Sequence, residues 1–178
     1  MLPEIKKKKA VSPMDNRPFP KRAEGQVFQV SRDQSVCAGC GTCELMCALV
    51  HKTDEDSASQ VGPVHQRIWI DRNEFEGYPT VLPCHQCDSP ECYFACPTGA
   101  LQIHSVTNAR FIDETKCVGC LSCREACAYA PPRINYDPDR DKALKCDLCS
   151  NRTEGPACVE FCPQKAIVLN PKEAYHEK

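Results

Sequence analysis

Sixteen cysteines, grouped in four runs at short fixed intervals, constrain this 178-residue sequence more than any other feature. The first run (37–47, CAGCGTCELMC) and the third (117–127, CVGCLSCREAC) share the spacing CxxCxxCxxxC. The second (84–96, CHQCDSPECYFAC) and the fourth (146–162, CDLCSNRTEGPACVEFC) begin with CxxC and end in CxxxC followed by proline. The runs therefore form an internal repeat that organises the chain from residue 37 onward.

The intervals within a run indicate iron and sulfur. A CxxC loop presents two thiolates to one metal centre, and a second interval of three adds a third thiolate from the same turn. The following interval of four starts a helix, so its cysteine points away and is available to a second site. Two-cluster ferredoxins follow this rule, in which the last cysteine of a run ligates the other cluster. Sixteen cysteines then predict four [4Fe-4S] clusters with none left over.

Composition agrees with a metal-organised fold. Cysteine contributes about nine points of the 42% hydrophobic fraction, which leaves a lean conventional core that clusters would supplement. Four-cysteine zinc sites would explain the CxxC pairs alone, but they leave Cys43 and Cys123 without a role and do not predict Pro97 and Pro163. A disulfide scaffold is disfavoured because the triplets would give crowded bridges in a chain without an export signal.

The ends and the charge of the chain set further expectations. No apolar run follows the basic N-terminal residues, and no window approaches a membrane span, so we expect a cytoplasmic chain without a membrane span. The formal net charge of -2 becomes roughly -10 when four clusters are counted. An acidic holoprotein makes nucleic acid an unexpected partner.

Short hairpins and helices are expected around the cysteine loops. Alternating apolar residues predict strands or hairpins in 67–72 and 100–113, and a short strand after each CxxxCP end. Residues 131–141 are expected to form a strand that ends in a turn at Asp137 and Pro138. Helical pieces are expected at 43–50 and 123–128. The basic, proline-rich residues 1–26 predict an extended arm, and the polar loop 51–66 is a candidate docking surface or a flexible insertion.

With these runs in order, residues 27–170 resemble the four-cluster ferredoxin-like electron-transfer subunits of molybdenum and tungsten pterin oxidoreductases, the group that includes the iron-sulfur subunits of dimethyl sulfoxide reductases. The segments CHQCDSPECYFACPTGAL, CVGCLSCREAC and CDLCSNRTEGPACVEFCPQKAI carry the likeness. It implies an α+β fold of two bacterial-ferredoxin-like dicluster modules, one inserted in the other. The expected parts are an N-terminal arm (1–26), the outer module (27–77 and 133–170), the inner module (78–132) and a C-terminal tail (171–178).

The resemblance also implies which cysteines share a cluster, because the runs pair first with fourth and second with third. The four implied ligand sets, named here first to fourth, are Cys37, Cys40, Cys43 and Cys162; Cys47, Cys146, Cys149 and Cys158; Cys84, Cys87, Cys92 and Cys127; and Cys96, Cys117, Cys120 and Cys123. Ala48 and Ala128 stand where related runs often have proline, which affects local loop shape but not ligation.

The resemblance further implies partners: a large catalytic pterin subunit with tungsten or molybdenum, and a further electron-transfer protein or flavin subunit. The short chain is more similar to the small subunits of tungsten aldehyde oxidoreductases and of class II benzoyl-coenzyme A reductase, which function in anaerobic metabolism. The expected function is relay of single electrons between the catalytic subunit and an external partner. No catalytic acid, base or nucleophile is assigned, so the chain itself is expected not to be an enzyme.

Two other classes of function remain as alternatives. A zinc-organised interaction module would be colourless and redox-silent. A radical enzyme would need one iron left open for substrate, which a full set of ligands disfavours. Among other residues, His85 is expected to be a surface or hydrogen-bonding residue, and Lys116 and Lys145 are expected to be solvated, although a positive charge near a cluster would raise its reduction potential.

Overall fold

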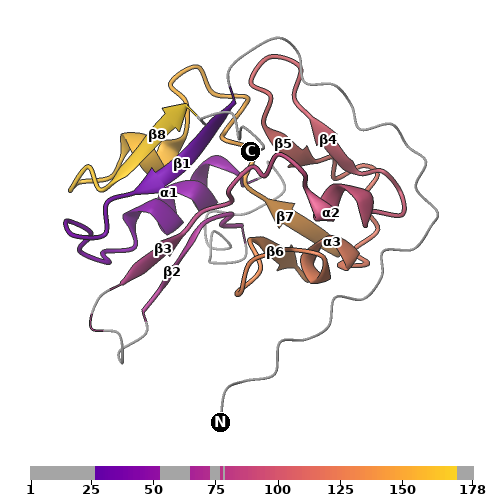
Figure 1. Cartoon of the computed structure of the whole chain (residues 1–178), viewed down its shortest axis with the longest axis horizontal. Helices are drawn as coiled ribbons and strands as arrows, with labels where there is room; N and C mark the ends of the chain where they lie inside the picture. Colours follow the sequence, from indigo (N-terminus) through magenta and orange to yellow (C-terminus); the bar gives the residue numbers. More distant parts are fainter. Residues whose placement is uncertain (1–26, 53–64, 73–76, 78, 172–178) are drawn as a thin grey trace, which may run out of the picture.

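The computed structural model describes residues 27–52, 65–72, 77 and 79–171 (Figure 1). Within them the elements are all short and alternate along the chain. In order they are β1 (Phe28–Arg32), α1 (Thr42–Val50), β2 (Trp69–Asp71), β3 (Thr80–Leu82), α2 (Glu91–Phe94), β4 (Leu101–Ile103), β5 (Arg110–Ile112), α3 (Ser122–Glu125), β6 (Ile134–Asp137), β7 (Lys142–Lys145), α4 (Ala157–Glu160) and β8 (Ile167–Pro171). The expected α+β class is confirmed.

The described strands pair into four two-stranded antiparallel sheets. Three are hairpins of neighbouring strands, β2 with β3, β4 with β5 and β6 with β7. The fourth joins the two ends of the described chain, because β1 pairs with β8 in a register that sets Phe28 opposite Pro171 and Arg32 opposite Ile167. In Figure 1 the indigo β1 and yellow β8 accordingly lie side by side.

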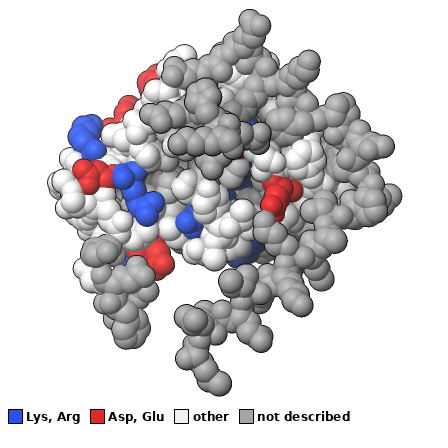
Figure 2. All heavy atoms as spheres, in the orientation of Figure 1, with Lys and Arg blue, Asp and Glu red and all other residues white. Residues whose placement is uncertain are grey.

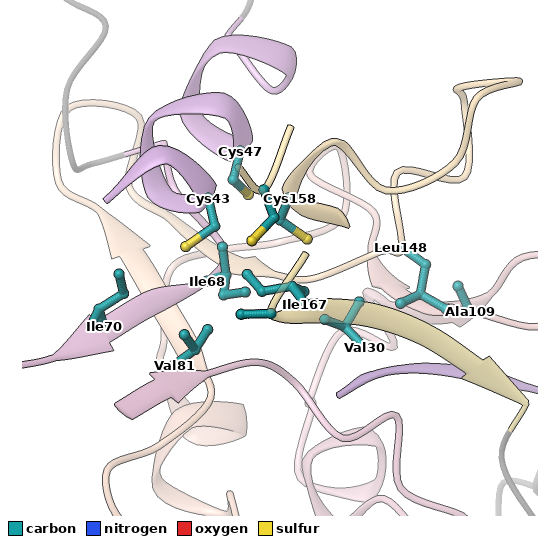
Figure 3. Packing of buried hydrophobic residues seen from close by; sticks show 12 residues of the cluster. Val30, Cys43, Cys47, Ile68, Ile70, Val81, Ala109, Leu148, Cys158 and Ile167 are labelled. Atoms are coloured by element: carbon teal, nitrogen blue, oxygen red, sulfur yellow. The ribbon is translucent and has the colours of Figure 1, made fainter. Parts of the chain in front are cut away.

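Two hydrophobic cores contain the cysteines among ordinary apolar side chains. The first core surrounds α1, α4 and the β1–β8 sheet, and its buried members include Val30, Ile68, Val81 and Ile167 (Figure 3). The second core surrounds the β4–β5 hairpin, and its buried members are Cys96, Ala100, Leu101, Ile112, Cys117, Cys123, Ile134 and Ala143. Hairpin β6–β7 therefore contributes to the second core.

A left-handed residue begins each helix that follows a CxxC loop of the first or third run. Gly41 precedes α1 with φ 80°, and Leu121 precedes α3 with φ 59°. Each lies directly after the second cysteine of its run, so the reversed backbone carries the chain from the cysteine loop into the helix that holds the third cysteine. The equivalent helices α2 and α4 follow Pro90 and Pro156 in extended backbone instead.

Most expected elements are confirmed, with one shorter helix. Strands lie at 69–71, 101–103, 110–112, 134–137 and 167–171, and α1 lies where a helix was expected. The helix expected at 123–128 ends at Glu125 because the N–H of Cys127 donates to the carbonyl of Arg124 (3.2 Å), a three-residue bond that tightens and closes the turn. The expected arm 1–26, most of the loop 51–66 and the tail from residue 172 lie outside the described residues.

The described residues carry surface charges of both signs, and the longest of their helices, α1, has 9 residues. On the face shown in Figure 2, basic and acidic side chains of described residues lie close together. None of the described helices combines the length and apolar character that crossing a bilayer requires.

Candidate metal centres

Three of the four cysteine sets each line a cavity of their own. The first set lines one of about 300 Å³ beside α1 and β8, and the fourth set lines another of about 300 Å³ beside α3 and β4. The third set lines a larger cavity of about 490 Å³. These are called the first, fourth and third cavities. In each of them three cysteines come from one run and one comes from another.

The four cysteines of the second set interact electrostatically with one another. Burial, followed by the negative charges of Cys47 and Cys149 and other neighbouring thiolates, raises the pKa of the Cys158 thiol far above its usual range. Burial also raises the pKa of Cys146, with Cys158 among the contributing charges. Figure 3 shows Cys47 and Cys158 close together between α1 and α4.

The cysteines fit a cationic inorganic group because their thiolates destabilise one another. Burial, followed by neighbouring negative charges, raises the pKa of Cys43 and of Cys123 to about 12. Burial also raises the pKa of Cys92 to about 11, although the charge of Lys145 opposes this shift. Four soft thiolates around one cavity are the donor set of iron-sulfur clusters, and metal binding would keep them deprotonated. The residues present therefore fit the [4Fe-4S] group that the spacing predicts.

Backbone N–H groups point at the sulfur of the last cysteine in three runs. Arg67 N donates to Cys47 Sγ (3.2 Å), and Ala100 N donates to Cys96 Sγ (3.2 Å). Arg133 N donates to Cys127 Sγ (3.3 Å). Such bonds stabilise the thiolate and are one means by which a protein sets the reduction potential of a cluster.

The sets differ in their access to the surface. Cys40 in the first set and Cys120 in the fourth are exposed, whereas every cysteine of the second and third sets is buried or half-buried. The half-exposed Val118 lies beside the fourth cavity. The first and fourth sets therefore approach the solvent, and the other two lie deeper.

Neighbouring sets interact electrostatically in a fixed order. The negative charge of Cys43 in the first set raises the pKa of Cys158 in the second. Cys84 in the third set raises the pKa of Cys146 in the second, and Cys92 in the third raises that of Cys123 in the fourth. Electrostatic contacts thus connect the first set with the second, the second with the third, and the third with the fourth.

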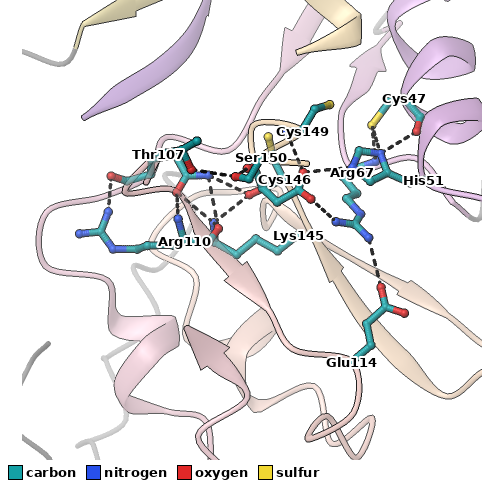
Figure 4. Close-up of polar contacts among 12 residues, drawn as sticks. Cys47, His51, Arg67, Thr107, Arg110, Glu114, Lys145, Cys146, Cys149 and Ser150 are labelled. Atoms are coloured by element: carbon teal, nitrogen blue, oxygen red, sulfur yellow. Dashed lines mark hydrogen bonds and ion pairs between the residues drawn. The ribbon is translucent and has the colours of Figure 1, made fainter. Parts of the chain in front are cut away.

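A chain of ion pairs borders the second set, and sequence reasoning missed it (Figure 4). His51 Nδ1 lies 2.8 Å from the carbonyl of Cys47, and its Nε2 lies 3.0 Å from Asp147 Oδ1. Arg67 donates to Asp147 Oδ2 (3.0 Å) and to Glu114 Oε1 (3.1 Å). Burial alone would lower the pKa of His51, but the hydrogen bonds, that to Asp147 first, raise it to about 11, so His51 is a cation. Only the position of His51, four residues after Cys47, hinted at this role.

Lys145 is buried, so the expectation that it is solvated was wrong. Its exposed fraction is 2%, and its Nζ donates to the carbonyls of Arg110 (2.8 Å) and Cys146 (3.2 Å) and to Gln86 Oε1 (3.5 Å). Burial favours the neutral amine, but the charges of nearby thiolates, Cys84 first, raise the pKa of Lys145. β7 ends at Lys145 and directs it inward, which the spacing of the cysteines does not reveal.

Lys116 lies at the surface as expected, and His85 is half-buried beside the third cavity. Lys116 has a half-exposed side chain, and its Nζ lies 2.9 Å from Asp113 Oδ2. His85 stacks on Tyr129 with ring centroids 4.2 Å apart and lines the third cavity. That cavity already holds four cysteines, which accords with a contact role for His85.

Comparison with known proteins gives the family. The profile of the 4Fe-4S dicluster domain matches residues 77–172. The putative electron transport protein YsaA of Escherichia coli K12 is 34% identical over 143 residues, covering 76% of this chain and 84% of YsaA. The probable anaerobic dimethyl sulfoxide reductase chain YnfG of the same strain is 34% identical over 162 residues, covering 82% of this chain and 74% of YnfG.

A solved structure shares the fold. A chain of the active-site complex BamBC of benzoyl coenzyme A reductase, bound to 1,5-dienoyl-CoA, superposes with a TM-score of 0.50 at 17% identity and covers 86% of this chain and 81% of its own. The chain belongs to the 4Fe-4S dicluster domain family of iron-sulfur electron-transport proteins.

Proposed function

We propose that the chain holds four [4Fe-4S] clusters, one in each cysteine set, and relays electrons along them. The observation that carries this proposal is the grouping around the three cavities, where each set of four cysteines draws on two runs. A zinc site made of two CxxC pairs would not require the third cysteine of one run to lie beside the last cysteine of another run.

The relay follows the order of the sets. Each cluster would accept and release one electron. Exposure of Cys40 and Cys120 supports the first and fourth sets as the two ends of the relay, where a donor and an acceptor could approach. The electrostatic contacts between successive sets, through Cys43, Cys84 and Cys92, support short distances between neighbouring positions. The residues of the chain would ligate the clusters, hold them in position and shield them from solvent. None is assigned as a catalytic acid, base or nucleophile.

The two halves of the chain form nested modules in this proposal. The outer module would comprise residues 27–77 and the end of the chain to 170, with the inner module inserted from residue 78. Pairing of β1 with β8 supports it, because these strands close the outer half around everything between them. The inner module would extend from its expected end at 132 to include hairpin β6–β7, since Ile134 and Ala143 pack in the second core.

The partner is proposed to be a large catalytic pterin subunit carrying tungsten or molybdenum, with a further electron-transfer protein or flavin subunit at the other end. YnfG is named as a dimethyl sulfoxide reductase chain, and the BamBC structure is an active-site complex, so relatives and fold neighbours occur in multi-subunit oxidoreductases. A reducing cytoplasmic compartment suits sixteen cysteines that serve as ligands.

Metal and sulfide analysis of protein purified without oxygen tests the proposal. We expect about sixteen irons and as many acid-labile sulfides per chain, with broad visible absorbance that dithionite bleaches. Zinc without sulfide would overturn it, because zinc thiolates are colourless and redox-silent. Co-purification of the native complex, with identification of the large subunit and its metal, tests the partner.

A further inference from the structure

Three basic side chains line the third cavity, whose cysteines are Cys84, Cys87, Cys92 and Cys127. They are Arg110, Arg133 and Lys145, and the acidic residue of the lining is the exposed Glu91. The described linings of the first and fourth cavities, by contrast, contain only apolar and uncharged polar residues besides cysteine. The third cavity is therefore the one of these three with an excess of positive charge.

Lys145 is held as an ammonium ion by its hydrogen bonds. Three uncharged oxygens, the carbonyls of Arg110 and Cys146 and the side-chain oxygen of Gln86, lie within 3.5 Å of its Nζ. Three acceptors require three N–H groups, and a neutral amine has only two. Because these acceptors carry no net charge, the positive charge of Lys145 is not neutralised by them.

The two arginines are fixed against the same cavity. Arg110 is 1% exposed, and its guanidinium donates to the carbonyls of Gln86 (2.6 Å) and Asp88 (3.2 Å), between the cysteines of the second run. Arg133 is 8% exposed, donates through its side chain to the carbonyl of Pro131 (2.9 Å), and lies 5.5 Å from the Tyr129 ring centroid. Guanidinium groups keep their charge at any working pH.

Lys145 also lies beside the second set, through its hydrogen bond to the carbonyl of Cys146, but the other cations there are paired with carboxylates. His51 contacts Asp147, and Arg67 contacts both Asp147 and Glu114. Equal and opposite charges at such short range largely cancel their field at the second set. The third cavity is thus distinguished by a lining in which buried basic side chains outnumber acidic ones.

We propose that Lys145, Arg110 and Arg133 make the third set the position of highest reduction potential in the chain. This inference rests on the proposed function, because it supposes a cluster in the third set. Reduction by one electron from an external donor adds one negative charge there, and a buried positive charge stabilises that charge more than it would in water. The three cations act on the electron through the field at the cluster, so they are positioning residues.

The consequence concerns where an electron rests in the relay. The third set lies between the second and the fourth, and Lys145 also donates to the carbonyl of Cys146 in the second set. A single electron entering at either exposed end would then reside at this inner position, away from solvent, until a second one arrives or a partner removes it.

Redox titration of the holoprotein followed by electron paramagnetic resonance tests the inference. The third-set signal is identified by its alteration in Cys87→Ser. Lys145→Met keeps the length of the side chain and removes its charge. In this variant we expect the equilibrium constant for reduction of the third-set cluster to fall at least tenfold, which is about 59 mV for a one-electron couple. Lys145→Arg should retain the wild-type value to within threefold.

Lys142→Met is the matched control, because it removes the same charge from the same strand, where Nζ of Lys142 donates to the carbonyl of Cys117 in the fourth set. It should leave the third-set signal unchanged. Arg133→Gln should lower the third-set potential, and Glu91→Gln should raise it, so the sign can be read even if Lys145→Met loses its cluster. An unchanged potential in fully iron-loaded Lys145→Met or Arg133→Gln would overturn the inference. Low iron in the wild type would instead refute the proposed function.

Discussion

His51 Nε2 lies 3.0 Å from Oδ1 of Asp147, 96 residues later in the sequence, and this contact fastens the end of α1 to the loop of the fourth cysteine run. Asp147 also accepts from the N–H of Cys149 (2.9 Å), so one carboxylate joins a helix end, a ligand loop and Arg67. We expect His51→Gln to lower the free energy of unfolding by about 2 kcal/mol, because a buried charge-assisted hydrogen bond is lost. Chemical denaturation of the iron-loaded protein, followed by visible absorbance, measures the change.

The pH dependence of that loss follows from the raised pKa of His51. A group whose folded pKa lies above its unfolded value contributes fully below the unfolded value, about 6.5, and loses its contribution as pH rises through about 11. The difference between wild type and His51→Gln should therefore be largest near pH 6 and shrink steadily by pH 10. Arg152→Gln, which breaks the half-exposed pair with Glu160, is the control and should cost less than about 1 kcal/mol. A difference for His51→Gln that grows with pH would contradict this account.

Glu114 bridges two arginines from different parts of the chain. Its Oε1 lies 3.1 Å from Arg67 Nη2, and its Oε2 lies 3.1 Å from Arg140 Nη1 in the turn after β6. Glu114→Gln should destabilise the protein by about 1 kcal/mol, a modest value because the carboxylate is 31% exposed. Since salt screens such pairs, the difference should diminish at 1 M salt. Equal differences at low and high salt would assign the loss to packing instead of charge.

The parts of the fold that follow from local patterns could be predicted from the sequence. The apolar alternation around 100–113 predicts the β4–β5 hairpin. The interval of four between Cys43 and Cys47 predicts the helix that the structure shows as α1. Four cysteines line each of three cavities, and the ligand sets themselves came from the family resemblance, not from a local pattern. For the hairpin and the helix, a short stretch of sequence contains the physical cause.

The rest depends on contacts between distant segments. Helices α2 and α4 have four residues each, too few for a helical period to appear in the sequence. The burial of Lys145 depends on carbonyls from Arg110 and on the amide of Gln86, which lie 35 and 59 residues away. Pairing of β1 with β8 likewise joins segments about 139 residues apart, as between Ser31 and Asn170. No local pattern records such neighbours.

Two glycines with left-handed backbone differ in the space around them, so alanine substitutions there distinguish the cost of a steric clash from the cost of backbone strain. Gly119 has φ 68°, and a Cβ there would meet the backbone oxygen of Asp141 at 2.7 Å; Gly155 has φ 81° and nothing within 4 Å. Gly155→Ala should cost about 1 kcal/mol from backbone strain alone. Gly119→Ala should cost at least about 1 kcal/mol more, because the β6–β7 turn must move away. Thermal or chemical unfolding of the holoprotein compares them, and equal losses would show that the turn yields freely.

The proposed nested pairing of runs predicts how the loss of one ligand affects the other clusters. Cys84 belongs to the third set and lines the third cavity with Cys127 from another run, so Cys84→Ser should remove or alter one cluster, with a loss of up to about four irons per chain. The inner module should be affected more than the outer, because Cys92 of the third set lies within electrostatic reach of Cys123 in the fourth. Cys37→Ser is the matched change in the first set and should spare the inner pair. Iron analysis and electron paramagnetic resonance distinguish the two patterns, and an equal loss of all four clusters in both variants would contradict the nested arrangement.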